Sequence, residues 1–218
     1  MDYTVFSTEF PDVKVFYNEP LKNYTFTKTG GRAAILIFPK DKKEASAVMH
    51  WLREHNIPTT ILGNASNVII KDGGISGAVI MLNDMSHLTV SGTQIVAEGG
   101  VALIDVSKEA AKNGLTGLEF ACGIPGSVGG AIFMNAGAYG GEVSEVVEYV
   151  EVITSDGEFK TYTNEDLDFS YRHSHVQKTG DLVIEVGFRL AEGVQEEIDQ
   201  KVAELTHLRE SKQPLEYP

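Results

Sequence analysis

Seven glycines fall between Gly123 and Gly141, in the segment GIPGSVGGAIFMNAGAYGG. The chain has 22 glycines in 218 residues, above the usual share of about 7%. Glycine permits positive φ and lets a ligand approach backbone N–H groups closely, which binding a pyrophosphate without a cationic side chain requires. Pro125 suits the first turn of a helix whose free N–H groups would face an anion. The segment predicts a phosphate-binding loop or, alternatively, tight turns with close helix-to-sheet packing.

A second polar loop, residues 63–67, has the sequence Gly-Asn-Ala-Ser-Asn and lies between two apolar segments. A plain hairpin needs only two such residues, so five small polar residues favour a ligand-binding loop. The alternative is that Asn and Ser side chains cap their own turn. Neither loop contains GxxxxGK[ST], and no GxGxxG opens a helix after the first strand, which argues against P-loop nucleotidases and Rossmann dehydrogenases.

The first half of the chain reads as β-α-β. Residues 33–38 form an apolar run, and from Asp41 the apolar residues follow helical spacing, with Glu44 completing a helix cap. Apolar, mostly β-branched runs at 59–62, 68–71 and 78–82 predict buried strands. We divide this half into an N-terminal extension, residues 1–21, and a first subdomain, residues 22–86.

The second half reads as mostly antiparallel. Short strands at 87–90 and 94–98 flank Ser91-Gly92, and a helix over 101–113 ends at Gly114. Strands at 146–155 and 158–163 flank Asp156-Gly157, a strong hairpin signal, and residues 182–190 form another strand. Residues 87–193 are the predicted second subdomain, and 194–218 begin with an amphipathic helix that runs to Lys212. The expected fold class is α+β.

Charge and composition exclude several kinds of partner. The net charge of −13 repels polyanions, so we expect no nucleic-acid partner. No apolar run is long enough to span a membrane, and the N-terminus lacks a secretory pattern. The single cysteine, Cys122, cannot form an internal disulfide. We therefore expect a cytoplasmic, monomeric protein without a membrane partner.

Residues 168–175 bring an arginine, an aromatic side chain and two histidines together. His173 and His175 lack a third ligand, so no metal site is predicted and solvated imidazoles are the expectation. Arg172 beside a glycine-lined anion pocket is suited to clamping a carboxylate or stabilising an enolate. Arg209 and Lys212, three residues apart on the last helix, are candidates for phosphate binding, with a solvated helix face as the alternative.

Five segments in order carry a family resemblance: TKTGG at 27–31, LGNASN at 62–67, GLEFACGIPGSVGGA at 117–131, MNAGAYGGEV at 134–143 and SYRHS at 170–174. Together with RESKQP at 209–214, they resemble the UDP-N-acetylenolpyruvoylglucosamine reductase family. The resemblance implies the FAD-binding fold of the vanillyl-alcohol oxidases, with two α+β subdomains and FAD between them. It also implies NADPH as co-substrate and UDP-N-acetylglucosamine enolpyruvate as substrate, in peptidoglycan precursor synthesis.

The resemblance also implies roles for individual residues. Arg172 resembles the catalytic arginine that stabilises the enol intermediate, and Tyr171, Arg209 and Lys212 are expected to bind substrate or phosphate. The residues expected to hold FAD come from both loops: Gly63, Asn64, Ala65, Ser66, Asn67, Gly123, Ile124, Pro125, Gly126, Ser127, Gly129, Gly130, Ala131, Asn135, Gly137, Ala138, Tyr139 and Gly140.

The sequence departs from the family pattern in two respects. Ala65 replaces the second glycine of G-N-G-S-N, a change that costs little if φ stays negative there. Family members continue into a domain whose Ser-Cys-Gly-Ser stretch supplies the proton donor, and the apolar Leu215 and Tyr217 at the end of this chain lack packing partners. We expect a truncated, FAD-binding portion with negligible turnover alone.

Two other functions remain open at this point. One is a non-catalytic flavin or nucleotide-binding module, and the other is an oxidase of the same fold. Covalent flavin attachment in such oxidases needs a histidine or cysteine at the ring, and Cys122 is the single cysteine available.

Overall fold

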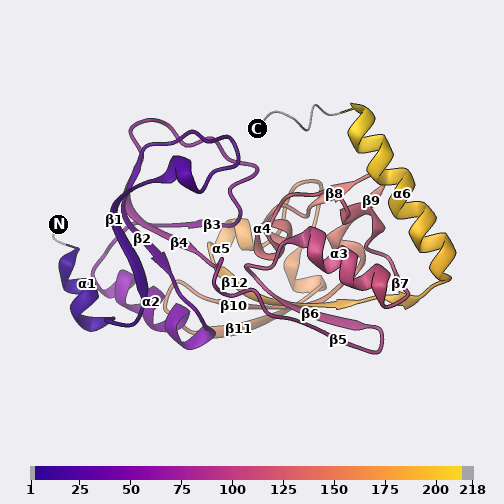
Figure 1. Ribbon diagram of the computed structural model, residues 1–218. Coiled ribbons are helices and arrows are strands. Elements are labelled where there is room, and N and C mark those ends of the chain that lie inside the picture. The colour runs from indigo at the N-terminus through magenta and orange to yellow at the C-terminus, as the bar shows by residue number, and fades with distance from the viewer. Residues whose placement is uncertain (1–2, 213–218) are drawn as a thin grey trace.

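The computed structural model describes residues 3–212 (Figure 1). These residues form two large sheets with helices packed on them and two small two-stranded sheets. The yellow helix α6 lies at the far end from the N-terminal half. The predicted unpacked tail with Leu215 and Tyr217 lies outside the described residues.

The first sheet has four strands in the order β1-β2-β4-β3, and α2 packs on one face. Strands β2, β4 and β3 are parallel, whereas β1 pairs antiparallel with β2 at the edge. The Asp41 side chain accepts a hydrogen bond from the Glu44 N–H at 2.8 Å, so α2 has the predicted cap. The elements are α1 Thr4–Glu9, β1 Lys14–Pro20, β2 Arg32–Phe38, α2 Lys42–Glu54, β3 Thr59–Leu62 and β4 Ile75–Met81.

The second sheet is antiparallel, with five strands in the order β11-β10-β12-β6-β5. Helices α3 and α4 cover one face, where their apolar residues share a core with the strands (Figure 1). The elements are β5 Leu88–Ser91, β6 Gln94–Glu98, α3 Leu103–Lys112, β7 Leu115–Thr116, α4 Val128–Phe133, β8 Gly137–Ala138, β9 Gly141–Glu142, β10 Val147–Ile153, β11 Phe159–Thr163, α5 Val176–Thr179, β12 Leu182–Arg189, β13 Ala191–Glu192 and α6 Gln195–Lys212.

The two halves share core and polar contacts. Ile153, Leu182 and Ile184 of the second sheet pack into the core beneath α2. The Lys42 ammonium pairs with Glu151 and, at 3.0 Å, with Glu185. These contacts fix the second sheet against α2, so the space between the halves has a defined shape.

The predicted β-α-β and antiparallel halves are confirmed, as are both hairpins and the helix end at Gly114. The strand predicted at 68–71 is wrong, because among residues 3–212 this run pairs with no strand, and β2 and β3 are the neighbours of β4. Its Ile69 is 84% exposed. In α6, only Ile198 and Leu205 are buried, so the apolar stripe is narrower than predicted.

The segment expected as an N-terminal extension contributes α1 and the edge strand β1 to the first sheet. The Phe6 ring is fully buried, 4.8 Å from the Phe10 ring and 5.2 Å from the Trp51 ring between centroids. The division of the chain after residues 21, 86 and 193 stays a prediction.

Phe6→Ala tests how firmly this segment belongs to the fold. Removing a fully buried aromatic ring costs about 3 to 5 kcal/mol through lost transfer energy and the remaining cavity. We expect a loss of that size in the free energy of unfolding measured by urea titration. Val5→Ala, at a side chain that is 49% exposed, is the control and should change stability little. Equal stability of the two variants would contradict the packing of α1.

Candidate cofactor-binding site

A cavity of about 1140 Å³ lies between the two halves. Typical ligand pockets measure roughly 300 to 1000 Å³, so this cavity suits a long ligand. All of residues 63–67 line it, together with Ile124, Pro125, Gly126, Ser127, Gly129, Gly130, Ala131, Gly137, Ala138 and Tyr139. Arg172, Arg209 and Lys212 line it as well. The structure therefore brings the two predicted loops and the three predicted cations together.

The two loops touch at Gly63. A Cβ on Gly63 would lie 2.2 Å from the Ser127 Oγ, far inside van der Waals contact. Only glycine lets the backbone of the first loop approach the start of α4 this closely. The contact makes one continuous wall from segments more than sixty residues apart in sequence.

The first loop offers unpaired backbone donors. In the part of the chain that the structure describes, no N–H of residues 64–67 donates to a protein acceptor. The side chains of Asn64, Ser66 and Asn67 likewise have no protein hydrogen-bond partner within residues 3–212. These groups do not cap their own turn, so they are available to an anionic ligand in the cavity.

Ala65 adopts the left-handed region, with φ +46°, and its side chain is buried. The expectation that alanine costs little there depended on a negative φ, so it is wrong. An L-residue other than glycine in this region costs about 1 to 2 kcal/mol. A left-handed residue can turn successive N–H groups toward one side, the arrangement of an anion-binding nest.

The start of α4 differs from the prediction. Pro125 lies three residues before the first helical residue, Val128, rather than in the first turn. The helix N–H groups already have acceptors: Val128 donates to the Val101 carbonyl at 2.8 Å and Gly129 to the Gly99 carbonyl at 2.9 Å. Gly130 donates to the Ser127 hydroxyl, which caps the helix. Among the described residues, the backbone N–H groups without a protein acceptor therefore lie in the first loop and not at the start of this helix.

Three cationic side chains line the cavity of a chain with net charge −13. Within the described residues, neither Arg209 nor Lys212 has an ion-pair or hydrogen-bond partner. The Arg209 stem packs on Gly123, where an added Cβ would lie 2.5 Å from Cδ. Both cations thus lie at the cavity close to the first loop, and their predicted binding of phosphate stays a prediction.

Arg172 and the residues next to it make hydrogen bonds and ring contacts within the protein. The Arg172 Nη2 donates to the Gly137 carbonyl at 2.9 Å. Tyr171 is 84% exposed and does not line the cavity; its ring centroid is 5.5 Å from the Arg172 guanidinium carbon. His173 contacts the Gln177 amide and His175 packs edge-on against Tyr162. The expected solvated histidines are therefore half-buried, and among residues 3–212 no cluster of three potential metal ligands exists.

Some residues predicted to hold the cofactor do not line the cavity, and some residues that line it were not predicted. Gly123, Asn135 and Gly140 are not among the lining residues. The lining also includes Leu82, Asn83, Gly99, Gly100, Asp181, Leu182 and Val183, none of which we predicted. The Gly99-Gly100 pair directly follows the strand predicted at 94–98, and this feature of the sequence could have indicated a close backbone approach at the cavity. Cβ atoms there would lie 2.2 Å from the Val183 carbonyl oxygen and 1.8 Å from that of Leu82.

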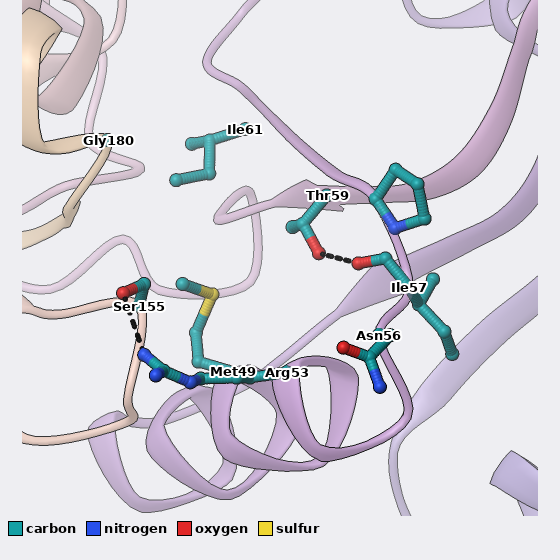
Figure 2. A pocket seen from close by; sticks show the side chains of 9 residues that line it. Met49, Arg53, Asn56, Ile57, Thr59, Ile61, Ser155 and Gly180 are labelled. Atoms are coloured by element: carbon teal, nitrogen blue, oxygen red, sulfur yellow. Dashed lines mark hydrogen bonds between the residues drawn. The ribbon is translucent and has the colours of Figure 1, made fainter.

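A smaller pocket of about 460 Å³ opens beside the large cavity and shares Thr59, Ile61 and Gly180 with it (Figure 2). Its floor comes from α2, where Arg53 reaches toward the Ser155 hydroxyl at 3.4 Å. No ionisable group faces its centre except Arg53, whose charge Asp156 neutralises. This pocket extends the cavity without adding chemistry of its own.

The comparisons with known proteins define the class first. Residues 33–163 match the family model described as an FAD binding domain. Cholesterol oxidase from Brevibacterium sterolicum shares the fold, with TM-score 0.61 at 14% identity over 84% of this chain and 38% of the oxidase. The chain is thus a flavoprotein with an FAD-binding domain of this fold, as predicted.

Nearer relatives define the family. A UDP-N-acetylenolpyruvoylglucosamine reductase from Pediococcus pentosaceus is 51% identical over 218 residues, which is 100% of this chain and 72% of the relative. The crystal structure of the reductase from Thermus caldophilus superposes with TM-score 0.78 at 35% identity, covering 92% of this chain and 70% of that one. The chain belongs to the UDP-N-acetylenolpyruvoylglucosamine reductase family. It is an FAD-dependent oxidoreductase.

The residues present suit FAD. The cavity is long, its first loop presents free N–H groups, and cations stand along its rim. A diphosphate needs donors and positive charge of this kind.

Within residues 3–212 no helix is long and apolar enough to cross a membrane.

Gly126→Val tests the cavity directly. Neither Gly126 nor Gly130 has a positive φ, and a Cβ on Gly126 would find no atom closer than 4.0 Å, with Ser66 Oγ at that distance. Valine should therefore fold normally while filling space between the two loops. We expect FAD affinity to fall by more than about tenfold, which is ~1.4 kcal/mol, in a fluorescence titration. Gly73→Val, also in open space but outside the cavity, is the matched control. Unchanged FAD affinity would exclude this wall from the site.

Ala65→Gly tests the strain in the first loop. Glycine relieves the positive φ, so we expect the free energy of unfolding to rise by about 1 kcal/mol despite the added chain entropy. Ala191→Gly, at an exposed strand residue without positive φ, is the control and should not stabilise the protein. Urea titration of the FAD-free proteins measures both, and a loss of stability in Ala65→Gly would contradict the strain.

Proposed function

We propose that the chain serves in the reduction of UDP-N-acetylglucosamine enolpyruvate to UDP-N-acetylmuramate by NADPH, in peptidoglycan precursor synthesis. The observation that carries the proposal is that Arg172 lines the cavity, where its guanidinium donates to the carbonyl of Gly137 in β8. FAD supplies the hydride-transfer chemistry when bound. The protein residues bind the anionic groups, orient the reactants and stabilise the charge that develops.

Arg172 is the proposed catalytic residue. It lines the cavity, it is exposed, and only one of its guanidinium nitrogens has a described protein acceptor. Its remaining donors suit an oxyanion that gains charge in the transition state, because preorganised donors stabilise such charge most. We assign it the stabilisation of the enolate formed from the enolpyruvyl group.

The other cations and the first loop are proposed to bind phosphates. The N–H groups of residues 64–67, which have no protein acceptor among the described residues, suit the FAD diphosphate. They lie in one run that includes the strained Ala65. Arg209 and Lys212, in the last turns of α6, have no ion-pair or hydrogen-bond partner among residues 3–212 and suit phosphates of the nucleotide substrates. Tyr171 is proposed to contact substrate from the rim, because its ring is exposed beside Arg172.

An oxidase with covalently attached flavin has no support in this cavity. Covalent attachment in such oxidases usually uses a histidine or cysteine at the ring, and none of the described lining residues is either. Cys122 is half-buried, with its Sγ 3.8 Å from the Thr206 hydroxyl. The cytoplasmic location and the monomeric state stay predictions.

Arg172→Ala tests the proposed role. Because the match to the Pediococcus pentosaceus relative covers 72% of that protein, the test uses this chain fused to the remaining segment of the relative. Removing one preorganised donor to developing charge costs about 100-fold or more in kcat, whereas FAD affinity should change little. Lys178→Ala is the matched control, because its ammonium pairs with Asp168 at 3.0 Å and neither residue lines the cavity, although both are close to Arg172 in sequence. Equal kcat in both variants would refute the assignment.

A further inference from the structure

Arg172 is held in a conformation that its own residue type disfavours. It occupies the second middle position of a turn closed by two hydrogen bonds between Ser170 and His173, at 3.1 and 3.0 Å. Its φ is +55°, in the left-handed region. Arginine has no intrinsic reason to adopt this region, so surrounding contacts must hold it there.

Gln177 supplies those contacts on one side of the turn. Its Nε2 donates to the Arg172 carbonyl at 3.0 Å and to the Phe133 carbonyl, at the end of α4, at 2.7 Å. Its Oε1 lies 3.1 Å from the His173 Nδ1. One amide group thus joins the backbone of Arg172 and the side chain of the next residue to the helix that forms the cavity wall.

Asn135 holds the other side. Its side chain is 1% exposed, and its Nδ2 donates to the Ser170 carbonyl at 3.1 Å while its Oδ1 accepts from the Ser144 N–H at 3.2 Å. Both ends of the turn are therefore tied to the glycine-rich segment. The pKa of the Glu142 carboxyl is lowered mostly by its hydrogen bond with the Ser144 hydroxyl. The Asn135 side chain and the charge of Arg172 lower this pKa further.

We infer that Gln177 is a positioning residue for Arg172, setting the left-handed turn from which the guanidinium reaches the cavity. The inference rests on the proposed catalytic role of Arg172. Gln177 itself is not among the residues that line the cavity, so it acts through the turn and not on a reactant. A purely structural role would join α5 to α4 through Phe133 alone and would need no contact with Arg172.

Hydrogen exchange tests the inference on the chain as it is. Gln177→Glu keeps the size and the Oε1 acceptor of the side chain but removes the Nε2 donor. We expect the amides of Ser170 and His173 to exchange at least about tenfold faster in this variant. Gln195→Glu is the matched control, because Gln195 also donates to a backbone carbonyl, that of Ala111 at 3.0 Å, away from the cavity. Unchanged protection at both amides would overturn the inference.

Turnover in the fused reductase separates positioning from structure. We expect Gln177→Glu to lower kcat about tenfold, because small misplacements of catalytic groups are costly, with KM for NADPH and FAD affinity within about twofold. In an Arg172→Ala background the same change should lower kcat no further, since its effect passes through Arg172. Gln177→Ala repeats the test if the glutamate variant does not fold.

The outcomes separate the two claims. An unchanged kcat in Gln177→Glu, or a loss that adds to that of Arg172→Ala, overturns the positioning role alone. If Arg172→Ala itself leaves kcat unchanged, the proposed catalytic role fails and the positioning role falls with it.

Discussion

The close contact between the Gly63 backbone and the Ser127 side chain at the start of α4 is the constraint on which the site depends. It exists because Gly63 has no Cβ: any side chain there would overlap the Ser127 hydroxyl. The same close approach recurs where Gly99 and Gly100 lie against the carbonyls of Val183 and Leu82. A cavity wall made of backbone leaves room and N–H groups for a ligand, which bulky side chains would have taken.

Backbone strain and charge accumulate around that wall. Ala65, Tyr139 and Arg172 all have positive φ, and all three line the cavity. Such residues persist only where surrounding contacts over-determine them, and they concentrate at functional sites. The three cations beside them stand out in an acidic chain, and two have no described protein partner. Clustered positive charge carries an energetic cost that bound anionic groups would offset.

The shape of the cavity depends on how the halves are joined. Ile153 and Leu182 extend the core beneath α2, and Lys42 bridges two glutamates of the second sheet. The tip of the β10–β11 hairpin adds a further contact, since the Ser46 hydroxyl donates to the Gly157 carbonyl at 2.7 Å. A rigid junction matters because a ligand that spans both halves gains affinity when its site is already formed.

The sequence alone determined the elements that depend on a few neighbouring residues, such as a helix cap or a tight turn. Asp41 caps α2, Gly157 turns a hairpin at φ +85°, and the glycine-rich segment lines the cavity, all as predicted. Only the tertiary structure decided the rest. The run at 68–71 has strand character but no partner, Ala65 takes a positive φ, and the α4 N–H groups bond to neighbouring loops instead of a ligand. Each of these depends on which distant backbone occupies the adjacent space, and residue types alone do not specify that.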